Sequence, residues 1–293
     1  MNLTVSIIIP TYRDWDRLRL CLHALQDQSY SKNEFEIIVI NNDPDDDIPD
    51  HLMTFSNVKF ITESKPGSYS ARNAGLRLAK GEIIGFTDSD CVPQKDWIQN
   101  AVKYFQDHPE CSRIAGNILI LQKNGKPSVI ETYNQIYAFP QKAVLKNYGG
   151  SMTANLFTYK FLFDKVSYFN EGLMAYGDLD WGSLATNAGY RIDYVENVIV
   201  YHPPRSLKEL IIKEKRLGGG GLHFYQKKRS NWVNVLKFFY NIRPRSGSLR
   251  LMLSLKNTNK RDVVFIPLLR YYLHIFRYFE TLRVQFGKKP NRL

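Results

Sequence analysis

The chain has 293 residues, 44% of them hydrophobic, which is enough to bury the core of one large domain or two smaller ones. Its three cysteines (Cys21, Cys91 and Cys111) have no metal-type spacing, and so sparse and odd a set argues against a disulfide framework. The opening apolar run has no basic stretch or cleavage site and is too short to span a bilayer. We therefore expect no signal peptide and a reducing, cytoplasmic environment.

The formal net charge of +12 is divided unevenly along the chain. Residues 1–204 carry 19 Lys and Arg against 24 Asp and Glu, whereas residues 205–293 carry 21 against 4. We predict a mildly acidic domain over 1–204 and a separate basic region over 205–293. A strongly basic region favours a polyanionic partner, either nucleic acid or an anionic membrane surface.

Strands and helices alternate in the first half. "VSIIIPTY" predicts a strand up to Pro10, and "DRLRLCLHALQDQS" predicts a helix that Asp14 or Asp16 can cap. "FEIIVINND" and "VKFITES" predict strands, "SYSARNAGLRLAKG" predicts a helix that ends at Gly81, and "EIIGFTDSD" predicts another strand. This alternation predicts a mostly parallel sheet with helices on both faces, whose ligands bind beyond the carboxyl ends of the strands.

Residues 92–176 are less regular. A helix is predicted from Trp97 to Phe105, and "SRIAGNILIL" predicts a strand followed by more extended chain. A glycine turn and an apolar strand are predicted within "GGSMTANLFTYKFLF". An acidic loop then leads into a short helix that Gly189 closes, and a last strand or strand pair, "RIDYVENVIVYH", ends at His202.

The basic region is predicted to be mostly helical. An amphipathic helix is expected from Leu207 to Leu217, broken by the glycine run at 218–221, and Pro267 interrupts the later aromatic stretch. Basic and aromatic residues together are typical of an interfacial helix on an anionic leaflet. The competing interpretation is a helical subdomain whose aromatic side chains pack on the catalytic domain.

Asp88 and Asp90 follow a buried-type strand with one residue between them. Carboxylates are preferred ligands of Mg²⁺ and Mn²⁺, and such an ion is often shared with a diphosphate. The competing interpretation is a solvated turn in which one acid caps a helix. We favour the metal site because the pair stands at the end of an apolar strand in an α/β pattern.

Other candidate residues are more ambiguous. Asp178 and Asp180, on a predicted loop before a short helix, could provide a general base, or one could cap the helix while the other is solvated. His202 could be a third metal ligand, although a structural role is slightly favoured. Arg72 could bind a phosphate or a carboxylate, or form a surface salt bridge.

With these elements in order, the sequence resembles the family 2 glycosyltransferases, which have the GT-A fold. The matching segments are "VSIIIPTYR", "EIIVINND", "SARNAGLRLAKGEIIGFTDSD", "FNEGLMAYGDLDWGSLATNAGYRI" and "VIVYH". They span about residues 4–202 and leave out the basic region. The resemblance implies a GT-A catalytic domain, with a Rossmann-like mixed sheet flanked by helices. It also implies an inverting, nucleotide-sugar-dependent glycosyltransferase.

The resemblance also implies roles for individual residues. The nucleotide-diphosphate-sugar would contact Pro10, Thr11, Tyr12, Asn42, Arg72, Asp88 and Ser89. Asp88 and Asp90 would bind Mg²⁺ or Mn²⁺, with His202 a weaker third ligand. Asp178 matches the base that deprotonates the acceptor hydroxyl, and Asp180 matches an acid that supports the acceptor site.

Three positions depart from the family pattern. Asn42 stands where the family usually has an acid, although its amide oxygen can still accept a base N–H. Gly177 replaces the first acid of a usual Glu-Asp pair, and Leu184 replaces a frequent arginine. The first two invite an alternative in which the chain is a catalytically silent scaffold.

We expect an enzyme of surface polysaccharide or glycolipid biosynthesis that acts on a saccharide or lipid-linked acceptor. Its predicted location is the inner face of the cell membrane, where the basic region would meet anionic lipid. A nucleic-acid-binding protein is the other alternative, but the sequence contains no recognised motif of that kind, and no nucleic-acid partner is expected.

Overall fold

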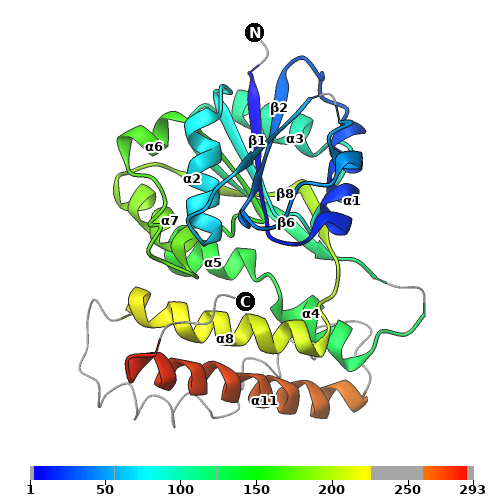
Figure 1. The fold of residues 1–293 in the computed structure, drawn as a ribbon, viewed down its shortest axis with the longest axis vertical. Coiled ribbons are helices and arrows are strands. Elements are labelled where there is room, and N and C mark those ends of the chain that lie inside the picture. The colour runs from blue at the N-terminus through cyan, green and yellow to red at the C-terminus, as the bar shows by residue number, and fades with distance from the viewer. Residues whose placement is uncertain (1–2, 56, 123–124, 226–259, 289–293) are drawn as a thin grey trace. The chain divides into compact units, whose positions relative to one another are not determined.

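The structure is a computed structural model that describes residues 3–55, 57–122, 125–225 and 260–288 (Figure 1). The chain divides into two compact units. The first comprises Met1–Leu121, Pro140–Gly172 and Gly177–Pro203, and the second comprises Gln122–Phe139, Leu173–Tyr176 and Pro204–Leu293. The second unit thus includes two short segments from the region predicted to be catalytic. The domain boundary at residue 204 stays a prediction.

The described strands of the first unit form one mixed sheet of eight, in the order β3-β2-β1-β4-β7-β6-β8-β5. Its parallel half contains β1 (Val5–Thr11), β2 (Phe35–Asn41), β3 (Val58–Thr62) and β4 (Ile83–Thr87). The other half contains β5 (Val92–Pro93), β6 (Arg113–Ile120), β7 (Asn155–Tyr159) and β8 (Ile192–His202). Strand β7 is antiparallel to β4 and β6, and β8 is parallel to β6. The predicted α/β class is confirmed.

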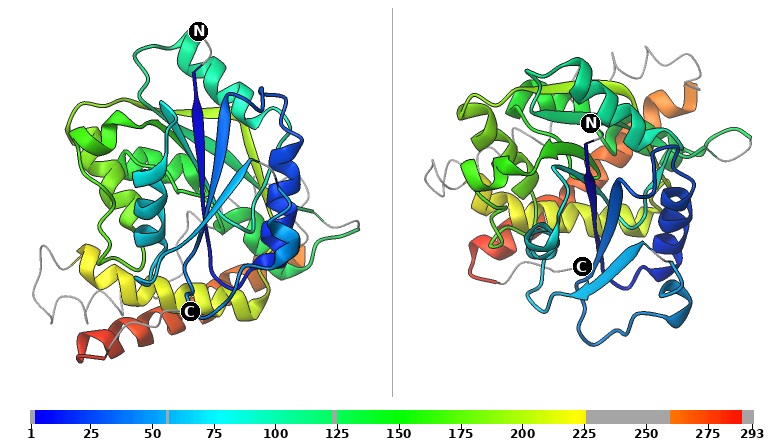
Figure 2. Two further views of the ribbon diagram at one scale, coloured as in Figure 1. Left: turned by 45° about the horizontal axis from the view of Figure 1, so that its top comes forward. Right: turned by 90° about the horizontal axis from the view of Figure 1, so that it is seen from above.

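Helices cover both faces of the sheet. Helix α1 (Trp15–Gln26) and helix α2 (Ser68–Leu78) lie on opposite sides of the parallel strands (Figures 1 and 2). The buried face of α1 carries Leu18, Cys21, Leu22 and Leu25, as the sequence pattern predicts. The remaining helices of this unit are η1 (Asp50–Leu52), α3 (Trp97–Asp107), α5 (Gln141–Tyr148), α6 (Phe161–Lys165) and α7 (Gly177–Asn187).

Helix α2 lies unusually close to the sheet. A Cβ atom on Gly75 would lie 2.8 Å from side-chain carbons of both Ile8 and Ile40, so only glycine permits this approach. The predicted end of this helix at Gly81 is wrong, because Ala79 is already extended. Gly81 instead donates its N–H to Ser6 Oγ at 2.8 Å.

The described part of the second unit contains three helices of eight residues or more. Helices α4 (Val129–Tyr137), α8 (Leu207–Tyr225) and α11 (Lys260–Gln285) share a small apolar core. The buried members of this core are Tyr133, Leu210, Ile266 and Leu273. Next to it, the Arg277 guanidinium of α11 donates two hydrogen bonds to the buried Glu214 carboxylate of α8, at 2.5 and 2.9 Å.

Two predicted helix breaks in this unit are wrong. Helix α8 continues through the glycine run at 218–221, because α11 approaches it closely there. A Cβ atom on Gly218 would lie only 2.2 Å from the carbonyl oxygen of Arg277. Pro267 lies inside α11 without ending it, since buried side chains before and after it hold the helix against its neighbours.

Arg113 in β6 is a fully buried cation that hydrogen-bonds to neutral partners. Its Nη1 donates to the carbonyl oxygens of Gly149 and Gly182 at 3.2 and 2.9 Å. Its Nη2 donates to Thr186 Oγ1 and to the Tyr190 carbonyl, both at 2.7 Å. Burial lowers the pKa of the guanidinium to about 10, so it stays charged at neutral pH. Arg113 therefore joins the C-terminal ends of α5 and α7, where helix dipoles favour a cation.

We expect Arg113→Met to destabilise the protein by about 3 kcal/mol or more, because three carbonyls and a hydroxyl would lose a charged donor inside the protein. Chemical denaturation followed by circular dichroism measures this change. Arg191→Met is the matched control, since this half-exposed arginine pairs with Asp193 and Glu110 at the surface. The Arg191→Met variant should lose less than about 1 kcal/mol of stability. Equal losses would contradict the buried role of Arg113.

Candidate active site

Three parallel strands bring the predicted donor-binding residues to one edge of the sheet. Pro10 and Thr11 end β1 and are buried, whereas the Tyr12 side chain is half-exposed. Asn42 follows β2, and Asp88 follows β4. The hydroxyl of Thr11 is buried and has no hydrogen-bond partner in the described part of the chain. The edge therefore has the position that ligand sites take in parallel sheets.

Asp88 and Asp90 are each held by a basic side chain. Arg72 Nη2 of α2 donates to Asp88 Oδ1 at 2.5 Å, so the alternative of a surface salt bridge is wrong for this buried arginine. Asp90 Oδ2 lies 2.9 Å from His202 Nε2 and 3.9 Å from Arg17 Nη1. The structure thus brings both acids of the pair and His202 to the same edge.

His202 is fully buried, and its ring orientation suits a metal ligand. Its Nδ1 lies 2.6 Å from the carbonyl oxygen of Pro203. A carbonyl only accepts hydrogen bonds, so Nδ1 carries a proton and, in the neutral ring, the lone pair of Nε2 faces Asp90. Two electron-pair donors that converge in this way fit a shared cation. Among the described residues, no three His, Cys, Asp or Glu side chains are grouped closely enough to hold an ion.

Ser89 lies between the two acids and is buried. Its hydroxyl is 3.4 Å from Asp14 Oδ2, a long hydrogen bond to the residue before α1. This contact ties the loop after β4 to the start of α1. The predicted contact of Ser89 with the nucleotide-sugar stays a prediction.

Asp178 and Asp180 lie in the first turn of α7, not on a loop before it as predicted. Asp178 Oδ1 accepts hydrogen bonds from Tyr69 Oη at 3.0 Å and from the Leu179 N–H at 3.1 Å. Burial raises the pKa of Asp178, and the nearby Arg72 charge and the Tyr69 hydroxyl oppose that rise. Such a carboxylate can act as a general base. Asp180 is half-buried in the same turn.

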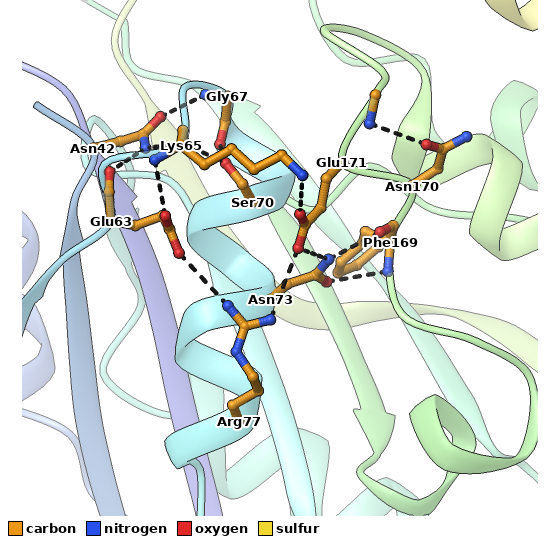
Figure 3. Close-up of polar contacts among 11 residues, drawn as sticks. Asn42, Glu63, Lys65, Gly67, Ser70, Asn73, Arg77, Phe169, Asn170 and Glu171 are labelled. Carbon is orange, nitrogen blue, oxygen red and sulfur yellow. Dashed lines mark hydrogen bonds and ion pairs between the residues drawn. The ribbon is translucent and has the colours of Figure 1, made fainter.

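A polar network connects the segment before α2 with the segment before α7 (Figure 3). Lys65 Nζ lies 2.5 Å from Glu171 Oε2, and Asn73 Nδ2 donates to Glu171 Oε1 and to the Phe169 carbonyl, both at 2.9 Å. The hydrogen bonds from Lys65 and Asn73 lower the pKa of Glu171. The chain leading to Asp178 is therefore fixed against α2.

Asn42 uses its side-chain amide to hold the segment at residues 63–67 (Figure 3). Its Nδ2 donates to the carbonyls of Glu63 and Lys65 at 2.8 and 2.9 Å, and its Oδ1 accepts from the Gly67 N–H at 2.7 Å. The amide oxygen has a second lone pair and can accept another hydrogen bond. The contact between Asn42 and the nucleotide base therefore stays a prediction.

Sequence reasoning missed two polar pairs at this edge. Arg13, whose φ of 51° is left-handed, donates from Nε to Asp43, and this hydrogen bond lowers the pKa of Asp43. Tyr69 is the second, as the donor to Asp178. The sequence contained a signal for both pairs. Asp43 directly follows the candidate residue Asn42, and Tyr69 lies one helical turn before the candidate residue Arg72.

Comparisons with known proteins agree with this geometry. Residues 6–166 match the family described as glycosyl transferase family 2. The chain is 30% identical over 230 residues to "Glycosyltransferase AglE" of Haloferax volcanii, covering 77% of this chain and 75% of that protein.

A second relative is "Dolichyl N-acetyl-alpha-D-glucosaminyl phosphate 3-beta-D-2,3-diacetamido-2,3-dideoxy-beta-D-glucuronosyltransferase" of Methanococcus voltae. It is 20% identical over 252 residues, with coverage of 80% and 77%. The solved structure of the mannosyltransferase PcManGT from Pyrobaculum calidifontis, in complex with GDP-Man and Mn²⁺, superposes with a TM-score of 0.57. That match has 19% identity and covers 99% of this chain and 77% of that one.

The chain belongs to glycosyl transferase family 2. The GT-A fold and the enzyme class predicted from the sequence are both confirmed.

We expect Asn42→Asp to destabilise the protein by about 2 kcal/mol, because a carboxylate would replace the donor that faces the Glu63 and Lys65 carbonyls. Chemical denaturation measures the loss. The matched control is Asn170→Asp, because Asn170 only accepts a hydrogen bond, from the Gly172 N–H, and aspartate preserves this. If both variants were as stable as the parent protein, Asn42 would not hold the 63–67 segment.

Proposed function

We propose that the enzyme transfers a sugar, with inversion, from a nucleotide-diphosphate-sugar to an acceptor hydroxyl. The observation that carries this proposal is the position of Arg72 between two acids with different tasks. Arg72 donates to Asp88 of the donor-side pair, and its charge also acts on Asp178. Two carboxylates in different surroundings at one edge are what a transfer with a separate base requires.

In the proposed reaction, Asp178 takes the proton of the acceptor hydroxyl as its oxygen attacks the anomeric carbon. The bond from that carbon to the diphosphate breaks, and the nucleoside diphosphate leaves with the electron pair. We propose that Asp88, Asp90 and His202 would hold Mg²⁺ or Mn²⁺, which would neutralise charge on the leaving diphosphate. The similar mannosyltransferase PcManGT, whose solved structure is a complex with GDP-Man and Mn²⁺, supports a nucleotide-diphosphate-sugar donor and a divalent metal ion.

The other donor contacts follow from the sheet edge. We propose that Pro10, Thr11 and Tyr12 contact the base and ribose, because the first two end β1 and Tyr12 follows it, next to the strand that leads to the acid pair. The unpartnered hydroxyl of Thr11 supports a ligand there. Asn42 and Ser89 complete the nucleotide-sugar site, and Asp180 supports the acceptor.

We propose a saccharide or lipid-linked acceptor, and a role in making a surface polysaccharide or glycolipid. The Methanococcus voltae relative supports a lipid-linked acceptor, because its name specifies a dolichyl phosphate sugar.

Asp178→Asn should lower turnover by roughly 10²- to 10⁴-fold, the usual contribution of a general base, while the variant still binds the donor. Thermal shift measures the binding of UDP-, GDP- and dTDP-sugars, each in the presence of Mn²⁺ or of a chelator. Turnover is then measured with the sugar nucleotide that binds. Chelator should abolish turnover and the donor-dependent shift in the parent protein.

Asp164→Asn, which changes an exposed carboxylate on α6, is the control. Its turnover and its donor binding should equal those of the parent protein. Full turnover in Asp178→Asn would reject the proposed base. Absence of any donor shift in folded parent protein would favour a silent scaffold.

We further propose that the helical unit docks peripherally on an anionic membrane surface at the inner face of the cell membrane. No described helix is both long and apolar enough to span a bilayer.

One face of α11 packs on α8, whereas another exposes an apolar stripe whose members are 44–68% exposed. They recur every three or four residues: Val264, Phe265, Leu268, Tyr271, Tyr272, Ile275 and Phe279. Residues 260–288 also carry six Lys and Arg against two Asp and Glu, which complements anionic lipid.

Replacing both Phe265 and Phe279 with glutamate should weaken binding to vesicles of phosphatidylcholine and phosphatidylglycerol by at least roughly tenfold, because two exposed rings would no longer enter the bilayer. Cosedimentation measures the binding, which should also fall with added salt. Phe161→Glu on α6 is the control, since that ring is also exposed but lies in the other unit. Failure of the parent protein to bind these vesicles would reject the membrane proposal.

A further inference from the structure

We propose that Tyr69 is a positioning residue for Asp178: its hydroxyl holds one carboxylate oxygen so that the other receives the acceptor's proton. This inference rests on the proposed role of Asp178 as the base.

The two oxygens of Asp178 have unequal surroundings. Oδ1 accepts two hydrogen bonds, from Tyr69 Oη at 3.0 Å and from the Leu179 N–H at 3.1 Å. Oδ2 accepts one longer hydrogen bond, from the Thr153 N–H at 3.4 Å. Because Oδ1 is already held by two donors, Oδ2 is the oxygen that remains available to take a proton.

The Tyr69 ring fits into a space that the chain leaves open for it. A Cβ atom on Gly177 would lie 2.7–2.9 Å from three ring carbons of Tyr69, closer than carbon atoms can pack. The φ of Gly177 is not left-handed, so the backbone itself does not require glycine there. The ring also contacts the Phe169 ring, with centroids 5.7 Å apart, and the Arg72 guanidinium lies 5.7 Å from its centroid.

The groups around Asp178 determine how its pKa changes when the Tyr69 hydroxyl is removed. Helix α2 contributes Tyr69 and the charge of Arg72, the chain before β7 contributes the Thr153 N–H, and α7 contributes the Leu179 N–H. Burial raises the pKa of Tyr69, so its hydroxyl stays protonated and donates to the carboxylate. Donation to the charged form lowers the pKa of Asp178, so removing the hydroxyl raises it.

Tyr69→Phe removes the hydroxyl and keeps the ring. We expect the acidic limb of the kcat profile to move to higher pH by about one unit, because one hydrogen bond to the carboxylate is lost. At neutral pH kcat should fall by roughly tenfold, while the donor KM changes by less than about twofold. A ¹³C NMR titration of the Asp178 carboxyl, assigned with Asp178→Asn, should show the same upward shift without any turnover.

Gly177→Ala tests the same contact from the other side. The methyl group of the new alanine should displace the Tyr69 ring and move the acidic limb of the kcat profile as Tyr69→Phe does. In the double variant with Tyr69→Phe, the acidic limb should move little further than in either single variant. Tyr104→Phe is the matched control, since Tyr104 donates to Asp193 at 3.2 Å away from the proposed base. Its pH profile should equal that of the parent protein.

The positioning role is overturned if Tyr69→Phe, folded by circular dichroism, moves neither the NMR titration nor the acidic limb. Additive effects of Tyr69→Phe and Gly177→Ala would also overturn it, because independent packing defects add. Failure of the proposed base is distinguishable: Asp178→Asn would then keep full turnover, whatever the NMR titration of the carboxyl shows.

Discussion

Acidic side chains are concentrated at the carboxyl edge of the sheet, and their charges must be compensated there before a donor arrives. Asp43 is paired with Arg13, Asp88 with Arg72, and Asp90 with the more distant Arg17. Asp178 instead accepts hydrogen bonds from neutral donors and is acted on by the more distant charge of Arg72. Arg72 acts on both the donor-side Asp88 and the proposed base, so the site depends on where α2 places this one buried guanidinium.

The position of α2 follows from contacts on two of its sides. Gly75 lets the helix rest directly on β1 and β2, which sets its distance from the strand ends that carry the acids. On another side, Asn73 exchanges hydrogen bonds with the backbone of Phe169 and binds Glu171, which fixes the chain that leads into α7. Arg72 and Asn73 are adjacent in sequence, so one helix orients both Asp88 and the chain that leads to the proposed base. A shift of α2 would disturb both functions together.

The features that the sequence predicted are those with a local or periodic signal. Parallel strands with polar ends, the Asp88–Asp90 spacing and the apolar face of α1 all follow from such patterns. The errors arose where a distant contact overrides local propensity. Glycines favour a helix break, but Gly218 stays helical because Arg277, far away in the sequence, packs against it. Gly81 resembles a helix cap, yet it is required by its approach to Ser6. The partners of Arg113 could not be predicted either, since they come from four separate positions later in the chain.

The departures from the family pattern at residues 42 and 177 have specific structural partners. Asn42 satisfies two carbonyls and one N–H of the 63–67 segment, which an acid could not do because it has no donor when ionised. Gly177 leaves room for the Tyr69 ring, whose hydroxyl reaches the aspartate next to that glycine. Both departures are thus accommodated by specific contacts of this chain, so neither residue is by itself a sign of a silent scaffold.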